Sequence, residues 1–61
     1  MAYPQYFNSR GHRYYKALVG MGSRASALKK CAEYRKENPR LLWSIHKEDD
    51  GRFSVGHAGR N

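Results

Sequence analysis

Aromatic and basic side chains interleave in the first third of the chain, where Arg13, Tyr14 and Lys16 stand close together. A tyrosine ring offers a flat face on which any nucleobase can stack, and a lysine or arginine offers a cation to a backbone phosphate. The chemistry open to these residue types is therefore the binding of a polyanion. The residues expected to make that contact, on nucleic acid or on another acidic partner, are Arg13, Tyr14, Lys16, Arg24, Lys29, Lys30, His46 and Arg52.

The net charge of the chain also indicates a polyanionic partner. Twelve lysines and arginines against five acidic residues give the 61-residue chain a net charge of +7. Such a field attracts polyanions and accelerates association, but it carries no sequence specificity. Two functions stay open: a nucleic-acid-binding module that contacts single strands or phosphate backbone, of DNA or RNA, through its sheet face and arm, or a small phage-type inhibitor or accessory factor that occupies an acidic or nucleic-acid-binding surface of a larger host protein.

Residues for catalysis or metal binding do not stand in a recognisable spacing. The three histidines and Cys31 lack metal-ligand spacing, and Asp49 with Asp50 is expected to form a turn rather than line a cleft. A core this small also leaves little room for a pocket of ~300 Å³ or more. The sequence therefore predicts a protein that is not an enzyme, with no catalytic residue, no metal site and no cofactor.

The segment from Gly20 to Ala25 matches the letters of the dinucleotide fingerprint G-x-G-x-x-A. A chain of 61 residues cannot build the two mononucleotide halves that such a site needs. Two readings remain. Ser23 caps a helix in a plain strand-to-helix turn, or Ser23, Arg24 and the free N–H groups hold one phosphate of a polymer.

The length and the cysteine content of the chain limit the number of domains and indicate the cellular location. The chain is long enough for one domain only. The single cysteine, Cys31, rules out an intramolecular disulfide, and with no secretory-signal pattern this favours a reducing, cytoplasmic location. No stretch approaches the ~20 apolar residues that cross a bilayer, so we expect no membrane contact.

Three regions follow from the patterning. Residues 1–11 read as an extended arm or a short extra strand, residues 12–56 as the folded domain, and residues 57–61 as a flexible tail. Within the domain, residues 12–19 form the first strand. Ser23 and Pro39 delimit a helix at residues 24–37. Its apolar arc contains Ala25, Ala27, Leu28, Cys31, Ala32 and Tyr34.

Two further strands follow the helix, at residues 41–47 and 52–56. A three-residue loop with Gly51 in the left-handed position pairs Ile45 with Val55, and places Glu48 opposite Arg52 as a charge pair. The sequence thus predicts an α+β fold, a small single-domain β-α-β-β unit with one helix packed on a narrow, mostly antiparallel sheet. A homodimer that joins two such sheets would cover their edges.

The two-residue period of the strands assigns the faces of this sheet. Tyr15, Ala17 and Val19 are expected on the core face of the first strand, with Trp43, Ile45, Phe53 and Val55 from the other strands. An open outer face is expected to collect His12, Tyr14, Lys16, Ser44, His46, Arg52 and Ser54. This outer face is either the binding surface or the ordinary polar side of a one-sided sheet.

Overall fold

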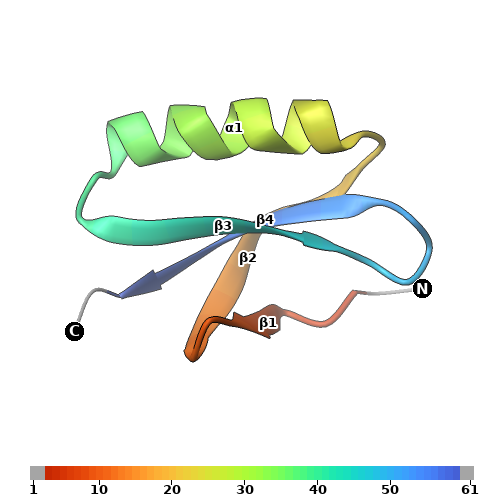
Figure 1. The fold of residues 1–61 in the computed structure, drawn as a ribbon, viewed down its shortest axis with the longest axis horizontal. Coiled ribbons are helices and arrows are strands. Elements are labelled where there is room, and N and C mark those ends of the chain that lie inside the picture. The colour runs from red at the N-terminus through yellow and green to blue at the C-terminus, as the bar shows by residue number, and fades with distance from the viewer. Residues whose placement is uncertain (1–2, 60–61) are drawn as a thin grey trace.

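A computed structural model describes residues 3–59 and contains four strands and one helix in the order β-β-α-β-β. The elements are β1 (Tyr6–Ser9), β2 (His12–Met21), α1 (Arg24–Glu37), β3 (Leu41–Lys47) and β4 (Phe53–Gly59). The strands form one antiparallel sheet in the order β1-β2-β4-β3, and α1 lies along one face of it (Figure 1). The predicted α+β class is confirmed, and the N-terminal region supplies a short extra strand.

The helix has the predicted bounds because its cap forms as expected. Ser23 accepts a hydrogen bond from the Ser26 backbone N–H at 3.1 Å, which satisfies one of the free donors of the first turn. Ala27 and Cys31 are buried, but Leu28 is 43% exposed. The apolar arc is therefore narrower than predicted, because a narrow sheet contacts only one stripe of the helix. The helix, the only one in residues 3–59, is not long and apolar enough to cross a membrane.

The turn between β3 and β4 has the predicted register. Ile45 lies opposite Val55, the Glu48 N–H donates to the Arg52 carbonyl at 2.7 Å, and Gly51 has a φ of 87°. The predicted charge pair between Glu48 and Arg52 is wrong, because the Glu48 carboxylate turns inward to Lys16.

The C-terminal strand is longer than predicted. β4 continues through His57 and Ala58 to Gly59, and Ala58 is 5% exposed. The expected loose tail is therefore corrected for these three residues, which pair with β3 from Leu41 to Trp43. The rest of the expected tail, residues 60–61, and residues 1–2 of the expected arm lie outside the described residues.

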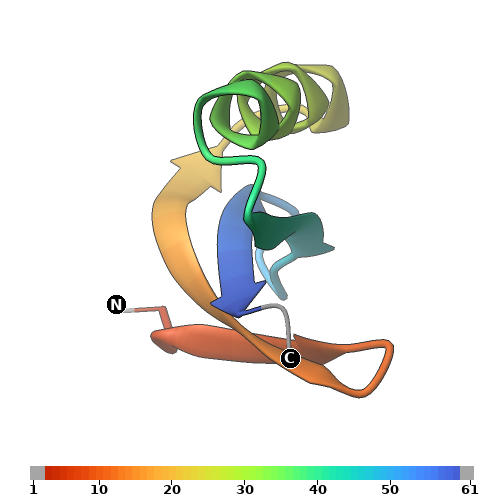
Figure 2. The ribbon, with the colours of Figure 1, turned by 90° about the vertical axis from the view of Figure 1, so that its left-hand side faces the viewer.

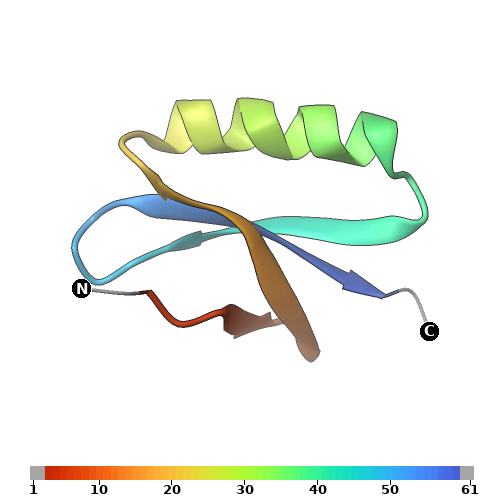
Figure 3. The same cartoon turned by 180° about the vertical axis from the view of Figure 1, so that it is seen from behind.

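The hairpin of β1 and β2 is closed by Arg10 and Gly11, whose φ values are 52° and 80°. Two consecutive residues with positive φ form the type I′ turn, whose twist matches that of the flanking strands. This turn fixes the register, so that Phe7 lies opposite Tyr14. The hairpin extends away from the helix, beneath β3 and β4 (Figures 1 and 3).

Two irregularities in β2 overturn the predicted face assignment. The pairing with β4 shifts between Lys16 and Leu18 and again between Leu18 and Met21. A bulge inserts an extra residue, so the side chains beyond it change face. Leu18 and Met21 consequently join the core beneath α1, whereas Ala17 and Val19 are exposed. The prediction that they are core residues is wrong. Tyr15 precedes both shifts and shares the face of Trp43, as predicted, but it is 50% exposed and so is not a core residue.

The curled sheet buries side chains on both faces. Between the sheet and α1 lies a main core whose buried members are Ala27, Cys31, Trp43 and Val55. Beneath the sheet lies a second core of Phe7, Tyr14 and Ala58. It forms because β2 bends across the end of the sheet and brings β1 under the other strands (Figure 2). The expectation of an open outer face is therefore wrong.

Candidate functional site

An aromatic row crosses all four strands in register. Tyr6 of β1 lies opposite Tyr15 of β2, Tyr15 lies opposite His57 of β4, and His57 lies opposite Trp43 of β3. The successive ring centroids are 6.2, 6.4 and 5.4 Å apart. Tyr34 of α1 stacks on Trp43 at 5.0 Å and ends the row. We call these five residues the aromatic row.

The two ends of the aromatic row differ in exposure. Trp43 is 9% exposed because α1 covers it, whereas Tyr6 and Tyr15 are 43% and 50% exposed. The helix covers only part of its face of the sheet, since β1 and the first half of β2 curl away from it, to the far side of β3 and β4 (Figures 1 and 2). The exposed end therefore presents tyrosine rings at the surface, held in place by rings that are themselves packed.

Arg13 supplies a cation at this exposed end. Its guanidinium carbon lies 4.5 Å from the centroid of the Tyr6 ring, a cation–π contact. Arg13 itself is exposed, and it belongs to β2 two residues before Tyr15. A base stacked on Tyr15 would thus have an arginine within reach of its phosphate.

Tyr14 and Lys16, predicted as contact residues on an open face, are buried instead. Tyr14 is 5% exposed and stacks on Phe7 with ring centroids 5.2 Å apart. The Lys16 side chain is 3% exposed, and its ammonium pairs with the Glu48 carboxylate. They do share one face with His46 and Ser54, as predicted, but the β1–β2 hairpin covers that face.

A buried polar cluster forms around Glu48. Its Oε2 accepts hydrogen bonds from Lys16 Nζ and from Ser54 Oγ, and Ser54 is fully buried. The His46 Nε2 lies 3.7 Å from Oε1. Burial acts to raise the pKa of Glu48, but the hydrogen bonds from Lys16 and Ser54 and the neighbouring positive charge outweigh it, so this pKa lies below its usual value. Glu48 is therefore a carboxylate at neutral pH.

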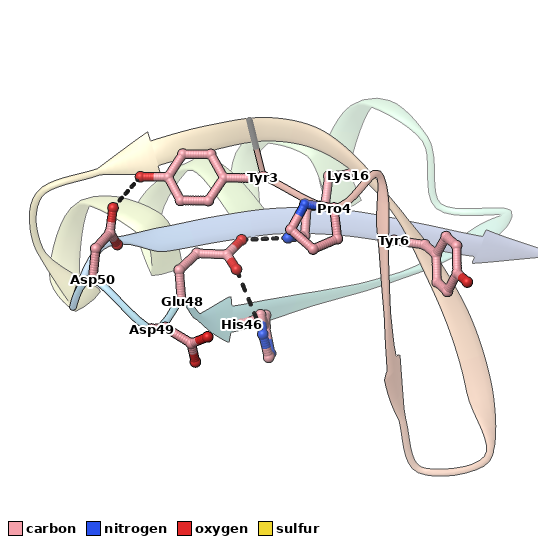
Figure 4. A pocket seen from close by; sticks show the side chains of 8 residues that line it. All are labelled: Tyr3, Pro4, Tyr6, Lys16, His46, Glu48, Asp49 and Asp50. Atoms are coloured by element: carbon pink, nitrogen blue, oxygen red, sulfur yellow. Dashed lines mark hydrogen bonds and ion pairs between the residues drawn. The ribbon is translucent and has the colours of Figure 1, made fainter. Parts of the chain in front are cut away.

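An open pocket of about 620 Å³ lies over this cluster (Figure 4). The segment that precedes β1 forms one wall, where the Tyr3 hydroxyl donates to Asp50 at 2.5 Å. The expectation that so short a chain lacks a pocket of this size is wrong, because that segment crosses the end of the sheet. The lining residues are Tyr3, Pro4, Tyr6, Lys16, His46, Glu48, Asp49 and Asp50.

The lining of the pocket favours a structural role over a reactive one. Three carboxylates repel a phosphate, and the single lysine is neutralised by Glu48. The hydrogen bond that Tyr3 donates raises the pKa of Tyr3 and lowers the pKa of Asp50. These groups fasten the N-terminal segment to the turn between β3 and β4.

The remaining predicted residues are scattered around the molecule. Arg24, Lys29 and Lys30 are exposed on α1, and Lys30 pairs with Glu33 at 3.4 Å. Arg52 donates to the Gly20 carbonyl at 3.1 Å, and the His46 ring stacks on Phe7 at 4.8 Å. Of the eight predicted contact residues, only Arg13 touches the aromatic row.

Sequence reasoning missed Tyr6, Tyr15 and His57 as members of one surface. A signal was available in Arg10-Gly11, because a two-residue turn there places Tyr6 opposite Tyr15. The signal for His57 was the predicted pairing of Ile45 with Val55, because the same register places His57 opposite Trp43, but the strand was predicted to end at residue 56.

Cys31 lies in the main core, as predicted, at 4% exposed. Burial raises the pKa of its thiol, although the charge of Arg35 acts in the opposite direction. Within residues 3–59, no three His, Cys, Asp or Glu side chains lie close enough together to hold a metal ion.

Comparisons of the chain with protein-family models, with curated proteins and with solved structures find no match.

Proposed function

We propose that this chain is a nucleic-acid-binding module that stacks the bases of a single strand on the exposed end of the aromatic row. The observation that carries the proposal is the registered row itself, in which Tyr6 and Tyr15 are exposed while Trp43 fixes the other end. Base–aromatic stacking contributes about 1–3 kcal/mol per base and tolerates any sequence. Rings held by packed neighbours lose little entropy on binding, which favours such a contact.

The charges support the same proposal. Arg13 lies over Tyr6, and Arg10 is exposed in the turn of the same hairpin, so the hairpin that carries the exposed rings also carries two cations. The net charge of +7 adds a long-range attraction for any polyanion. We therefore expect the bases to contact Tyr15 and Tyr6 while the phosphates lie along the arginines.

Fluorescence titration with short single-stranded DNA, single-stranded RNA and duplex DNA tests the proposal, at two salt concentrations. Micromolar or tighter binding to a single strand is expected, with an affinity that falls as salt rises. Tyr15→Ala should weaken it by about 1–3 kcal/mol, and Arg13→Ala should lower the salt slope by about one. An absence of binding to all three nucleic acids at low salt would discard the proposal.

Val19→Ala provides the matched control. Val19 belongs to the same strand as Tyr15 and is 45% exposed, but it lies outside the aromatic row. Its replacement should leave the affinity unchanged. An equal loss of affinity in Val19→Ala and Tyr15→Ala would show that the rings do not stack on bases.

A further inference from the structure

The edge of the sheet at β3 is open. In an antiparallel pair, residues alternate between those that exchange hydrogen bonds with the partner strand and those whose N–H and C=O point away from it. The Glu48 N–H points to β4 and donates to the Arg52 carbonyl, and the β3–β4 register is uninterrupted from Leu41 to Lys47. The alternation therefore directs the backbone groups of Trp43, Ile45 and Lys47 away from β4, to the side where no further strand lies (Figure 2).

Contacts within the chain cover one end of this edge and leave the other end open. The Leu41 N–H donates to the Asn38 carbonyl at 3.2 Å, and Arg35 reaches the Trp43 carbonyl at 3.5 Å. Among the described residues, the outward N–H groups of Ile45 and Lys47 have no such side-chain or loop contact. The second half of β3 therefore offers backbone donors to an added strand.

An exposed leucine of α1 lies on the flank of the helix next to this half of the edge. Arg35 contacts β3 at Trp43, and Leu28 lies seven residues earlier on the same flank of α1. Seven residues span about 10 Å of helix, which equals about three residues of strand. Since α1 and β3 run in opposite directions (Figure 1), this spacing implies that Leu28 is about level with Ile45 and His46. It is 43% exposed there.

Cations line the same edge. Arg24 and Arg35 lie on the flank of α1 that holds Leu28, and Arg40 and Lys47 lie at the two ends of β3. All four are exposed, and no carboxylate of the described residues forms an ion pair with any of them. Charge complementarity therefore favours an acidic partner at this edge.

We propose that the β3 edge binds an extended, acidic segment of a partner protein as an added strand. The segment would pair with the outward backbone groups of Ile45 and Lys47, and would place an apolar side chain against Leu28. Side chains two residues away point to the same face, so acidic residues in those positions would meet Arg24 and Arg35. This surface and this class of partner go beyond the proposed nucleic-acid contact, which uses the other end of the sheet.

A second copy of the chain fits this edge poorly. A copy would bring the same edge cations, Arg24, Arg35, Arg40 and Lys47, against those of its neighbour, and two chains of net charge +7 repel each other. An acidic segment removes this repulsion, which is why charge favours a different partner over self-association.

The test uses an eight-residue peptide of threonines with a central valine and a glutamate two residues to either side of it. NMR-detected hydrogen exchange on the full chain should show new protection of the Ile45 and Lys47 amides when this peptide is added. The Ser44 and His46 amides, which pair with β4, should be protected with or without it. At saturating peptide, unchanged exchange at Ile45 and Lys47 would overturn the proposal.

Charge variants separate strand addition from general attraction. Arg24→Glu should weaken peptide binding roughly tenfold. Lys29→Glu, which changes the net charge equally on the outer face of α1, should have little effect. Two further peptides carry N-methyl groups that block the backbone N–H donors along one edge of the peptide strand or along the other. One of these two peptides should no longer bind. Three outcomes would each refute an acidic strand as the occupant. Arg24→Glu and Lys29→Glu could weaken peptide binding equally, or both methylated peptides could bind as well as the unmodified one. Oligothymidine could also give the same new protection of the Ile45 and Lys47 amides.

Discussion

The Lys16 ammonium and the Glu48 carboxylate form an ion pair in the interior, where their side chains are 3% and 6% exposed. They belong to β2 and to the turn after β3, so the pair ties two distant segments together. Ser54 Oγ donates to the same carboxylate oxygen. A buried charge is tolerated only when it is paired and hydrogen-bonded, and this pair meets both conditions.

Removing one partner of this pair should greatly lower the free energy of unfolding. Lys16→Met leaves the Glu48 carboxylate buried without its cation, which should cost about 3–5 kcal/mol or unfold the protein outright. Urea unfolding followed by circular dichroism measures the loss. The double variant Lys16→Met/Glu48→Leu should recover most of the stability, because neither charge remains. Lys47→Met, at an exposed position, is the control, and a loss in Lys16→Met no larger than in this control would contradict the role of the pair.

Stability should fall in acid because of Glu48. Its pKa is lower in the folded protein than the ordinary value of 4.5, so the unfolded chain binds more protons between these two pKa values. The stabilisation is present above pH 4.5 and disappears as the pH falls through the lower, folded pKa. Unfolding free energies measured at a series of pH values should show this decline.

Two variants measure how much of the loss of stability in acid comes from each carboxylate. Glu48→Gln should flatten the pH dependence in that window, at the cost of lower stability near neutrality. Asp50→Asn should remove only the smaller share that comes from the hydrogen bond of Tyr3, because Asp50 is exposed. A pH profile unchanged by Glu48→Gln would show that another group controls acid unfolding.

Gly56 should tolerate no side chain. A Cβ at this position would lie 2.7 Å from Phe7 Cε1 and 3.0 Å from the Tyr15 carbonyl oxygen, and the backbone oxygen cannot move aside. Gly56→Ala should therefore cost about 1–3 kcal/mol through overpacking. Gly22→Ala is the control, because nothing lies within 4 Å of its Cβ. Thermal unfolding measures both variants, and equal melting temperatures would show that the second core can adapt.

A substitution at Arg10, in the turn between β1 and β2, should stabilise the protein. It holds a φ of 52°, a left-handed conformation that a residue with a long side chain adopts at a cost. Asparagine adopts this conformation more readily, so Arg10→Asn should raise the unfolding free energy by a few tenths to about 1 kcal/mol. Arg10→Ala lacks that preference and should bring no gain. Urea unfolding compares the two, and a loss of stability in Arg10→Asn would mean that the arginine side chain stabilises the turn.

The bounds of α1 and the turn between β3 and β4 could be predicted from neighbouring residues alone. Ser23 and Pro39 delimit α1 wherever the helix packs, since capping and the missing proline donor act within a few residues. The register of Ile45 with Val55 followed from a loop in which Gly51 takes positive φ. These features depend on neighbours in the chain, which is why they could be predicted.

The exposure of the strand residues depends instead on how the whole chain folds. The two bulges of β2 arise where it bends over β4, and they move Leu18 to the core while leaving Val19 outside. The fold of β1 beneath the sheet then buries Tyr14 and Lys16, and Tyr15 stays exposed because this part of β2 curls away from the helix (Figure 2). A two-residue period assumes a regular strand with one covered face. Curvature and coverage depend on residues distant in the chain, so the period alone could not locate the aromatic row.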